Sequence, residues 1–90
     1  MNDELENWRK QIDQLDEDVL NLLAKRIKIV RKIGRFKKEQ NIPTFDKDRW
    51  NKVLTSMLSK SEELGLSKDF TKKLYDLIHK YSVKIQKEST

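Results

Sequence analysis

The sequence has no cysteine, only one proline, two glycines and a single histidine. Without cysteine there can be no disulfide and no thiolate site, and one isolated histidine argues against a transition-metal site. No apolar run approaches the roughly 20 residues that span a bilayer, and the polar, acidic N-terminus does not resemble a secretory signal. We therefore expect no metal, no membrane association and a cytoplasmic location.

The residues that are present favour helices. Lysine, glutamate, leucine, aspartate and isoleucine are abundant, helix breakers are almost absent, and charged residues make up 39% of the 90 positions. This composition predicts an all-α protein in which residues 1–90 form a single domain. A chain this short buries a modest core, so self-association is a natural way to bury more apolar surface.

The net charge of +5 is compatible with a nucleic-acid partner. Acidic residues are interleaved with the basic ones on nearly every segment, however, and only residues 25–38 are dense in cations. We therefore expect solvated helix faces with one or two functional cations, and no nucleic-acid binding.

A first helix is predicted from Asn2 or Asp3 to about Gln40. That length, about 55 Å, is too great for a compact monomer of this size, so the helix needs partners on more than one side. Gly34 lies within it and indicates either close packing or a local break. Apolar residues recur along it with a spacing of three and four; this apolar stripe consists of Leu5, Trp8, Ile12, Leu15, Val19, Leu22, Ile29, Ile33 and Phe36.

Two shorter helices are predicted after a turn at residues 41–44, where Pro43 cannot continue the first helix. The second helix covers roughly residues 46–63, and Gly65 suits the left-handed position just past its end. Ser67 is expected to cap the third helix. The apolar face of the third helix carries Phe70, Leu74, Leu77, Ile78, Tyr81 and Ile85; we expect the last few residues to be frayed.

Arg26 is the one polar residue in the register of the apolar stripe. A buried guanidinium is costly unless it meets an anion, and it is well shaped to bind a carboxylate with two parallel hydrogen bonds. Arg26 therefore predicts either an internal ion pair or a site for an anionic ligand. Lys37 follows after about three helical turns, or about 16 Å, so the two cations share a face and can clasp a small dianion.

Arg9 lies about 25 Å from Arg26 along the same helix and cannot reach the same pocket within one chain. In an antiparallel dimer that crosses near Leu20, Arg9 of the partner subunit would reach it. A plain surface arginine is the alternative.

Four further residues are candidates at the helix ends. Asp46 and Arg49 are three residues apart, a spacing also typical of a plain helical ion pair. Ser82 and Gln86 border the buried face of the third helix, where they either orient a ligand or merely flank the helix end; His79 is given no role. These cations, hydroxyl and amide include no nucleophile–base pair, so they suit a reaction driven by positioning and electrostatics.

In combination, these features resemble the all-helical (AroQ-type) chorismate mutases. The features are Arg9 with Ile12, Leu15 and Asp16, the run from Leu22 to Arg26, Gly34 to Lys37, Pro43, Asp46 to Arg49, and the closing Ser82 and Gln86. The resemblance implies an intertwined homodimer of three-helix chains. It also implies a cofactor-free Claisen rearrangement of chorismate to prephenate, as used in phenylalanine and tyrosine biosynthesis.

The resemblance also implies roles for single residues. Arg26 and Arg9 of the partner subunit would bind the two substrate carboxylates. Lys37 and Gln86 would donate hydrogen bonds to the ether oxygen, where negative charge grows in the transition state. Of the remaining positions, Arg49 and Ser82 would support carboxylate binding, and Asp46 would hold the substrate hydroxyl or the start of the second helix.

Trp50 departs from the family pattern, which usually has a glutamate that binds the ring hydroxyl just after Arg49. An indole donates hydrogen bonds but does not accept them. Either Trp50 is turned into the core and another group holds the hydroxyl, or the enzyme is weakened, or the substrate differs.

Two other functions stay open. The related isochorismate-pyruvate lyases share the fold and the Arg–Lys pocket, although Asp46, Ser82 and Gln86 favour the mutase. A non-enzymatic basic helical module for nucleic-acid binding or oligomerisation would explain the charge and the long helix, but not Arg26 in the stripe.

Overall fold

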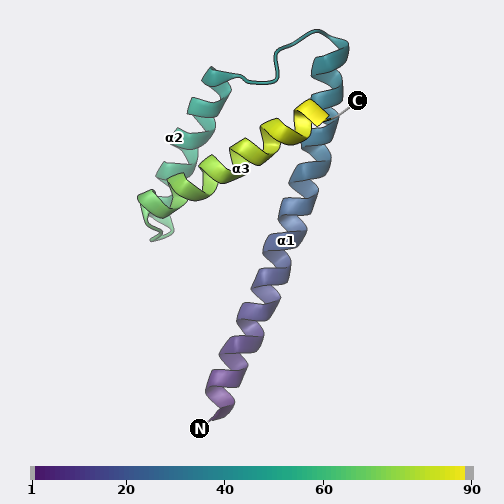
Figure 1. The fold of residues 1–90 in the computed structure, drawn as a ribbon. Helices are drawn as coiled ribbons and strands as arrows, with labels where there is room; N and C mark the ends of the chain where they lie inside the picture. Colours follow the sequence, from purple (N-terminus) through teal and green to yellow (C-terminus); the bar gives the residue numbers. More distant parts are fainter. Residues whose placement is uncertain (1, 89–90) are drawn as a thin grey trace.

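The computed structural model describes residues 2–88, which form three helices: α1 (Asn2–Glu39), α2 (Lys47–Glu63) and α3 (Lys68–Glu88) (Figure 1). There is no strand in this range, which confirms the all-α prediction. Fraying was expected for the last few residues. Of these, residues 89 and 90 lie outside the described range, and α3 continues to Glu88. No helix among the described residues is long and apolar enough to cross a membrane.

The first helix, α1, has 38 residues and runs without interruption through Gly34. Gly34 is buried, so its burial favours the predicted close packing, and the predicted alternative of a local break is wrong. The N-terminal half of α1 extends away from α2 and α3, and the described chain is 60 Å long in its greatest dimension (Figure 1). Only α3 packs against α1, while α2 packs against α3.

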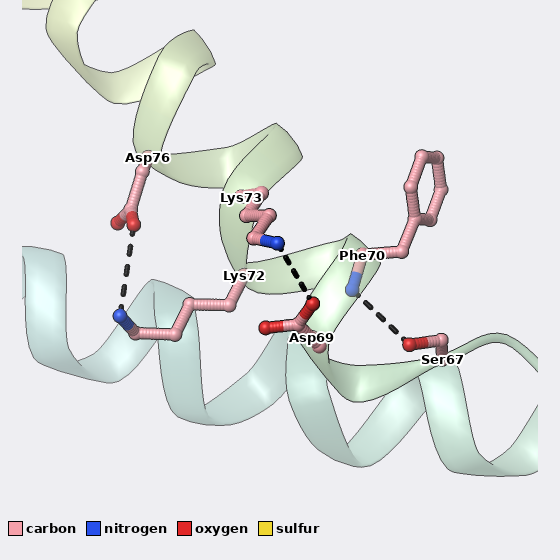
Figure 2. Close-up of polar contacts among 6 residues, drawn as sticks. All are labelled: Ser67, Asp69, Phe70, Lys72, Lys73 and Asp76. Carbon is pink, nitrogen blue, oxygen red and sulfur yellow. Dashed lines mark hydrogen bonds and ion pairs between the residues drawn. The ribbon is translucent and has the colours of Figure 1, made fainter.

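Local hydrogen bonds set the ends of the helices. After α1, Asn41 is left-handed with φ 56°, and the Ile42 amide donates to the Lys37 carbonyl at 2.8 Å, as in a Schellman motif. Gly65 closes α2 in the same way with φ 72°, which confirms its predicted conformation. Ser67 caps α3 as predicted, because its Oγ accepts from the amide of Phe70 at 3.2 Å (Figure 2).

Ion pairs lie on the first turns of α3. Lys73 pairs with Asp69 at 3.0 Å, and Lys72 with Asp76 at 3.7 Å (Figure 2). Exposed pairs of this kind contribute at most a few tenths of a kcal/mol each, roughly 0.3–0.5, so they do not hold the fold together.

The buried apolar core of the described chain is small. Among the large apolar side chains of the described residues, only Val30 of α1 and Ile85 of α3 are buried. All nine apolar residues of the stripe are exposed, from 41% at Ile33 to 63% at Leu22. The α3 helix therefore covers the neighbouring face of α1 and leaves the stripe open, which is an unusual amount of exposed apolar surface for a monomer.

Candidate active site

Arg26 lies half-buried on α1 and faces α3. Its Nη1 donates a hydrogen bond to Oγ of Ser82, which is only 5% exposed and itself donates to the Ile78 carbonyl at 2.8 Å. Within residues 2–88 no carboxylate pairs with Arg26, so of the two alternatives for Arg26 the described residues do not support an internal ion pair. A guanidinium has five N–H donors, and most of those of Arg26 stay available to an anionic ligand.

Lys37 is half-buried near the end of α1, eleven residues or about 16 Å beyond Arg26. Its ammonium donates to the Thr44 carbonyl at 2.9 Å and so ties the loop before α2 to the last turns of α1. The structure does not bring Lys37 into contact with Arg26. Two N–H donors of the ammonium remain after the bond to Thr44.

Gln86 lies one turn beyond Ser82 on α3. Its side-chain oxygen Oε1 is buried and has no hydrogen-bond partner in the described chain. An unpaired buried amide costs free energy, so it marks a place where a ligand can supply a partner.

Asp46 and Arg49 meet through a helix cap and do not form the plain side-chain ion pair that was the alternative to a role in the site. Oδ1 of Asp46 accepts from the backbone amide of Arg49 at 3.0 Å, and Asp46 has extended backbone angles typical of an N-cap. Both side chains are exposed. Asp46 therefore defines the start of α2, one of the two roles implied by the resemblance.

Trp50 packs against α3, where its ring stacks on His79 with centroids 4.1 Å apart and planes at 20°. Phe45 adds an edge contact to the same imidazole at 5.6 Å. Burial, then the Arg26 guanidinium, lower the pKa of His79 below its usual 6.5, while Asp76 acts in the opposite direction. His79 was given no role from the sequence, although its spacing from Ser82 and Gln86 places all three on one face of α3.

Arg9 is exposed and makes an ion pair with Glu6 of the same helix at 3.0 Å, a contact of little energetic value. It belongs to the part of α1 that extends away from α2 and α3 (Figure 1). Within one chain Arg9 is therefore remote from Arg26 and the other candidate residues.

An apolar groove between α1 and α3 runs beside Arg26. It is lined by Val19, Leu22, Leu23 and Ile27 of α1 and by Leu74, Tyr75, Leu77, Ile78 and Tyr81 of α3. The groove is continuous with the exposed stripe through Val19 and Leu22, so the site borders an uncovered apolar surface. No group of three histidine or acidic side chains suited to a metal ion occurs in residues 2–88.

Comparison with known proteins places these residues in a family. A curated bifunctional chorismate mutase/prephenate dehydratase from Aquifex aeolicus is 34% identical over 62 residues, which are 69% of this chain and 17% of that protein. The chain spans about a fifth of the length of the first six curated relatives it matches. A chorismate mutase from Methanocaldococcus jannaschii is 23% identical over 98% of this chain and 89% of its own length.

A solved structure, a conserved hypothetical protein from Pyrococcus furiosus, is 30% identical and covers 92% of this chain and 95% of its own, with a TM-score of 0.69. Residues 8–87 match the chorismate mutase type II family, and this range contains every candidate site residue from Arg9 to Gln86. The chain therefore belongs to the chorismate mutase type II family.

Proposed function

We propose that this chain is a chorismate mutase, an isomerase that converts chorismate to prephenate for phenylalanine and tyrosine biosynthesis. Family membership supports the activity, and the observation that carries it is Arg26, half-buried, held by Ser82 and without a carboxylate partner in the described chain. We also propose that residues 1–90 form one domain. A cytoplasmic location stays a prediction.

The rearrangement asks little of a protein beyond positioning and charge. Chorismate has two carboxylates and an ether oxygen, and its C–O bond breaks while a C–C bond forms, with no proton or group passed to the enzyme. Arg26 binds one carboxylate. Lys37, through its free N–H groups, and the side-chain NH2 of Gln86 donate to the ether oxygen, where negative charge accumulates in the transition state.

The second carboxylate requires a second chain. Within one chain, the N-terminal half of α1 extends away from Arg26, so its Arg9 cannot reach the site. The exposed stripe offers a surface on which an antiparallel partner can pack. We propose an intertwined homodimer in which Arg9 of the partner subunit completes the pocket. Covering the stripe would remove nine large apolar side chains from water, each worth about 1.5–3 kcal/mol when fully buried.

The remaining residues support this pocket. Arg49 strengthens its positive potential, Ser82 orients Arg26, and Asp46 fixes the start of α2. Trp50 forms an aromatic wall with His79. None of these roles calls for a metal or an organic cofactor.

The direct test mixes purified protein with chorismate, without added metal or cofactor, and follows the loss of chorismate absorbance together with prephenate formation. Saturable conversion is expected. Release of pyruvate from isochorismate, with no prephenate from chorismate, would instead establish the lyase. If a folded protein turned over neither substrate and bound nucleic acid with a steep salt dependence, the basic binding module would be the better description.

A further inference from the structure

The imidazole of His79 is held by aromatic contacts from two segments. Trp50 of α2 stacks on one face of the ring at 4.1 Å, and Phe45 of the preceding loop meets it edge-on at 5.6 Å. Stacking on Trp50 fixes the plane of the imidazole and leaves its nitrogens in the ring plane, away from the stacked face. The side chain is half-buried.

His79 lies one helical turn from Ser82, the residue that accepts the hydrogen bond of Arg26. It precedes Ser82 by three residues on α3, so the two side chains share a face about 4.5 Å apart along the axis. Ser82 accepts a hydrogen bond from Arg26, and the Arg26 charge adds to the effect of burial in lowering the pKa of His79. His79 therefore borders the proposed carboxylate-binding site.

Neither ring nitrogen of His79 forms a hydrogen bond with the described residues. The charged groups that act on the ring are Arg26 from α1 and Asp76 from its own helix; Trp50 and Phe45, which pack against it, do not titrate as bases. Burial and Arg26 outweigh Asp76 and lower the pKa of His79, which keeps the imidazole neutral at pH 7. A neutral imidazole has one bare nitrogen that accepts a hydrogen bond.

Apart from the Gln86 amide oxygen, the candidate residues around Arg26 offer few acceptors for a hydroxyl. Chorismate carries a ring hydroxyl besides its carboxylates and ether, and a hydroxyl buried in a site needs an acceptor. Arginine, lysine and tryptophan only donate. The exposed Asp46 already accepts from the Arg49 amide, and Gln86 lies about 10 Å along α3 from His79.

We propose that the His79 imidazole, held against Trp50, accepts the hydrogen bond of the chorismate ring hydroxyl and so selects for substrates that carry it. This inference rests on the proposed function and identifies a substrate-binding residue of the same site. It also gives Trp50 a defined part, because the indole orients the acceptor that it cannot itself provide.

The test compares two substrates: chorismate and the analogue in which hydrogen replaces the ring hydroxyl. His79→Phe keeps an aromatic ring against Trp50 but removes both nitrogens, and His79→Gln restores an acceptor. For His79→Phe we expect kcat/KM to fall about 10- to 100-fold with chorismate and less than about twofold with the analogue, with partial recovery in His79→Gln. Lys80→Gln, an exposed neighbour on α3, is the matched control and should match the wild type with both substrates.

The possible outcomes are distinct. Equal losses with both substrates, or no loss with chorismate, would overturn the role of His79 while leaving the mutase intact. If the wild-type protein failed to convert chorismate at all, the proposed function and this inference would both fall. Thermal melts of each variant show whether it is folded, and a folding defect lowers both rates together, so it cannot imitate the selective loss.

The pH profile provides a second readout. Protonation turns the accepting nitrogen of His79 into a donor, so kcat/KM for chorismate should fall as the pH drops from 7 toward 5, and His79→Phe should flatten this part of the profile. An unchanged slope in His79→Phe would contradict the proposal.

Discussion

The Arg26 guanidinium donates a hydrogen bond to the Ser82 hydroxyl, and this contact joins α1 to α3 across 56 residues of sequence. Ser82 is nearly inaccessible to solvent and is held in turn by the Ile78 carbonyl. Arg26 is thus oriented by the protein before any ligand binds, which is the arrangement that favours binding of charge in a transition state.

Replacing Arg26 with leucine should separate activity from stability. Loss of a positioned donor of this kind costs about 10²–10³ in rate, and loss of a carboxylate ligand as well should bring turnover of chorismate to background. The free energy of unfolding in urea should stay within about 1 kcal/mol of wild type or rise, because a half-buried cation without an anion is a liability. Arg31→Leu, an exposed position on the same helix, controls for charge; substantial turnover by Arg26→Leu would refute the site assignment.

Gln86→Leu should also reduce activity without reducing stability, in this case at an uncharged side chain. The substitution removes a buried amide oxygen that has no partner in the described chain, so stability in urea should not decrease. We expect kcat for chorismate to drop about 100-fold because one donor to the ether oxygen is lost. A clear destabilisation with normal kcat would assign Gln86 to packing alone.

Asp46 should act on stability through its cap. Asp46→Ala removes the acceptor for the Arg49 amide and should lower the free energy of unfolding by about 1 kcal/mol, whereas Asp46→Asn should retain most of it. The free energy of unfolding of both variants is measured in urea, and their turnover of chorismate is measured alongside. A stable Asp46→Asn protein with strongly reduced turnover would show that the carboxylate charge itself contacts the substrate.

Mixing two inactive variants tests whether Arg9 acts across the dimer. Arg9→Ala and Arg26→Ala chains should each be inactive, yet an equimolar mixture should recover roughly a quarter of wild-type activity, because half of the dimers are mixed and one pocket in each is intact. Subunit exchange is followed with a mass-tagged chain. Complete exchange without recovered activity would place Arg9 outside the pocket.

His79 should make stability depend on pH. Its pKa is lowered in the folded chain, so between that value and the usual 6.5 the unfolded chain binds more protons, and stability that is fully present above pH 6.5 is lost as the pH falls. The difference in unfolding free energy between wild type and His79→Phe should therefore change between pH 7 and pH 5. A constant difference over this interval would show that the imidazole titrates normally.

Local chemistry made the shorter helices predictable from sequence. The Ser67 cap and the left-handed Gly65 depend on residues next to them, so both were correct. The end of α1 was attributed to Pro43, whereas the structure closes it earlier with Asn41 in the left-handed conformation that asparagine tolerates. Asn41 is visible in the sequence, but the end of the helix was assigned from Pro43 instead.

The site was predictable only as far as helical register reaches. Periodicity singled out Arg26 and Lys37 because both belong to one helix. The stack of Trp50 on His79 joins different helices, and the bond from Lys37 to Thr44 depends on how the connecting loop folds back. Such contacts are set by the packing of α2 on α3 and by loop geometry, which no pattern within a single helix encodes.

The small core has a thermodynamic consequence. Val30 and Ile85 are the only buried large apolar side chains among the described residues, so a separated chain has little to offset the entropy of ordering its 38-residue first helix. If two chains cover each other's stripes, folding and assembly become one bimolecular reaction, and the melting temperature rises with protein concentration. Dilution of the protein then favours unfolding, and the complete pocket exists only in the dimer.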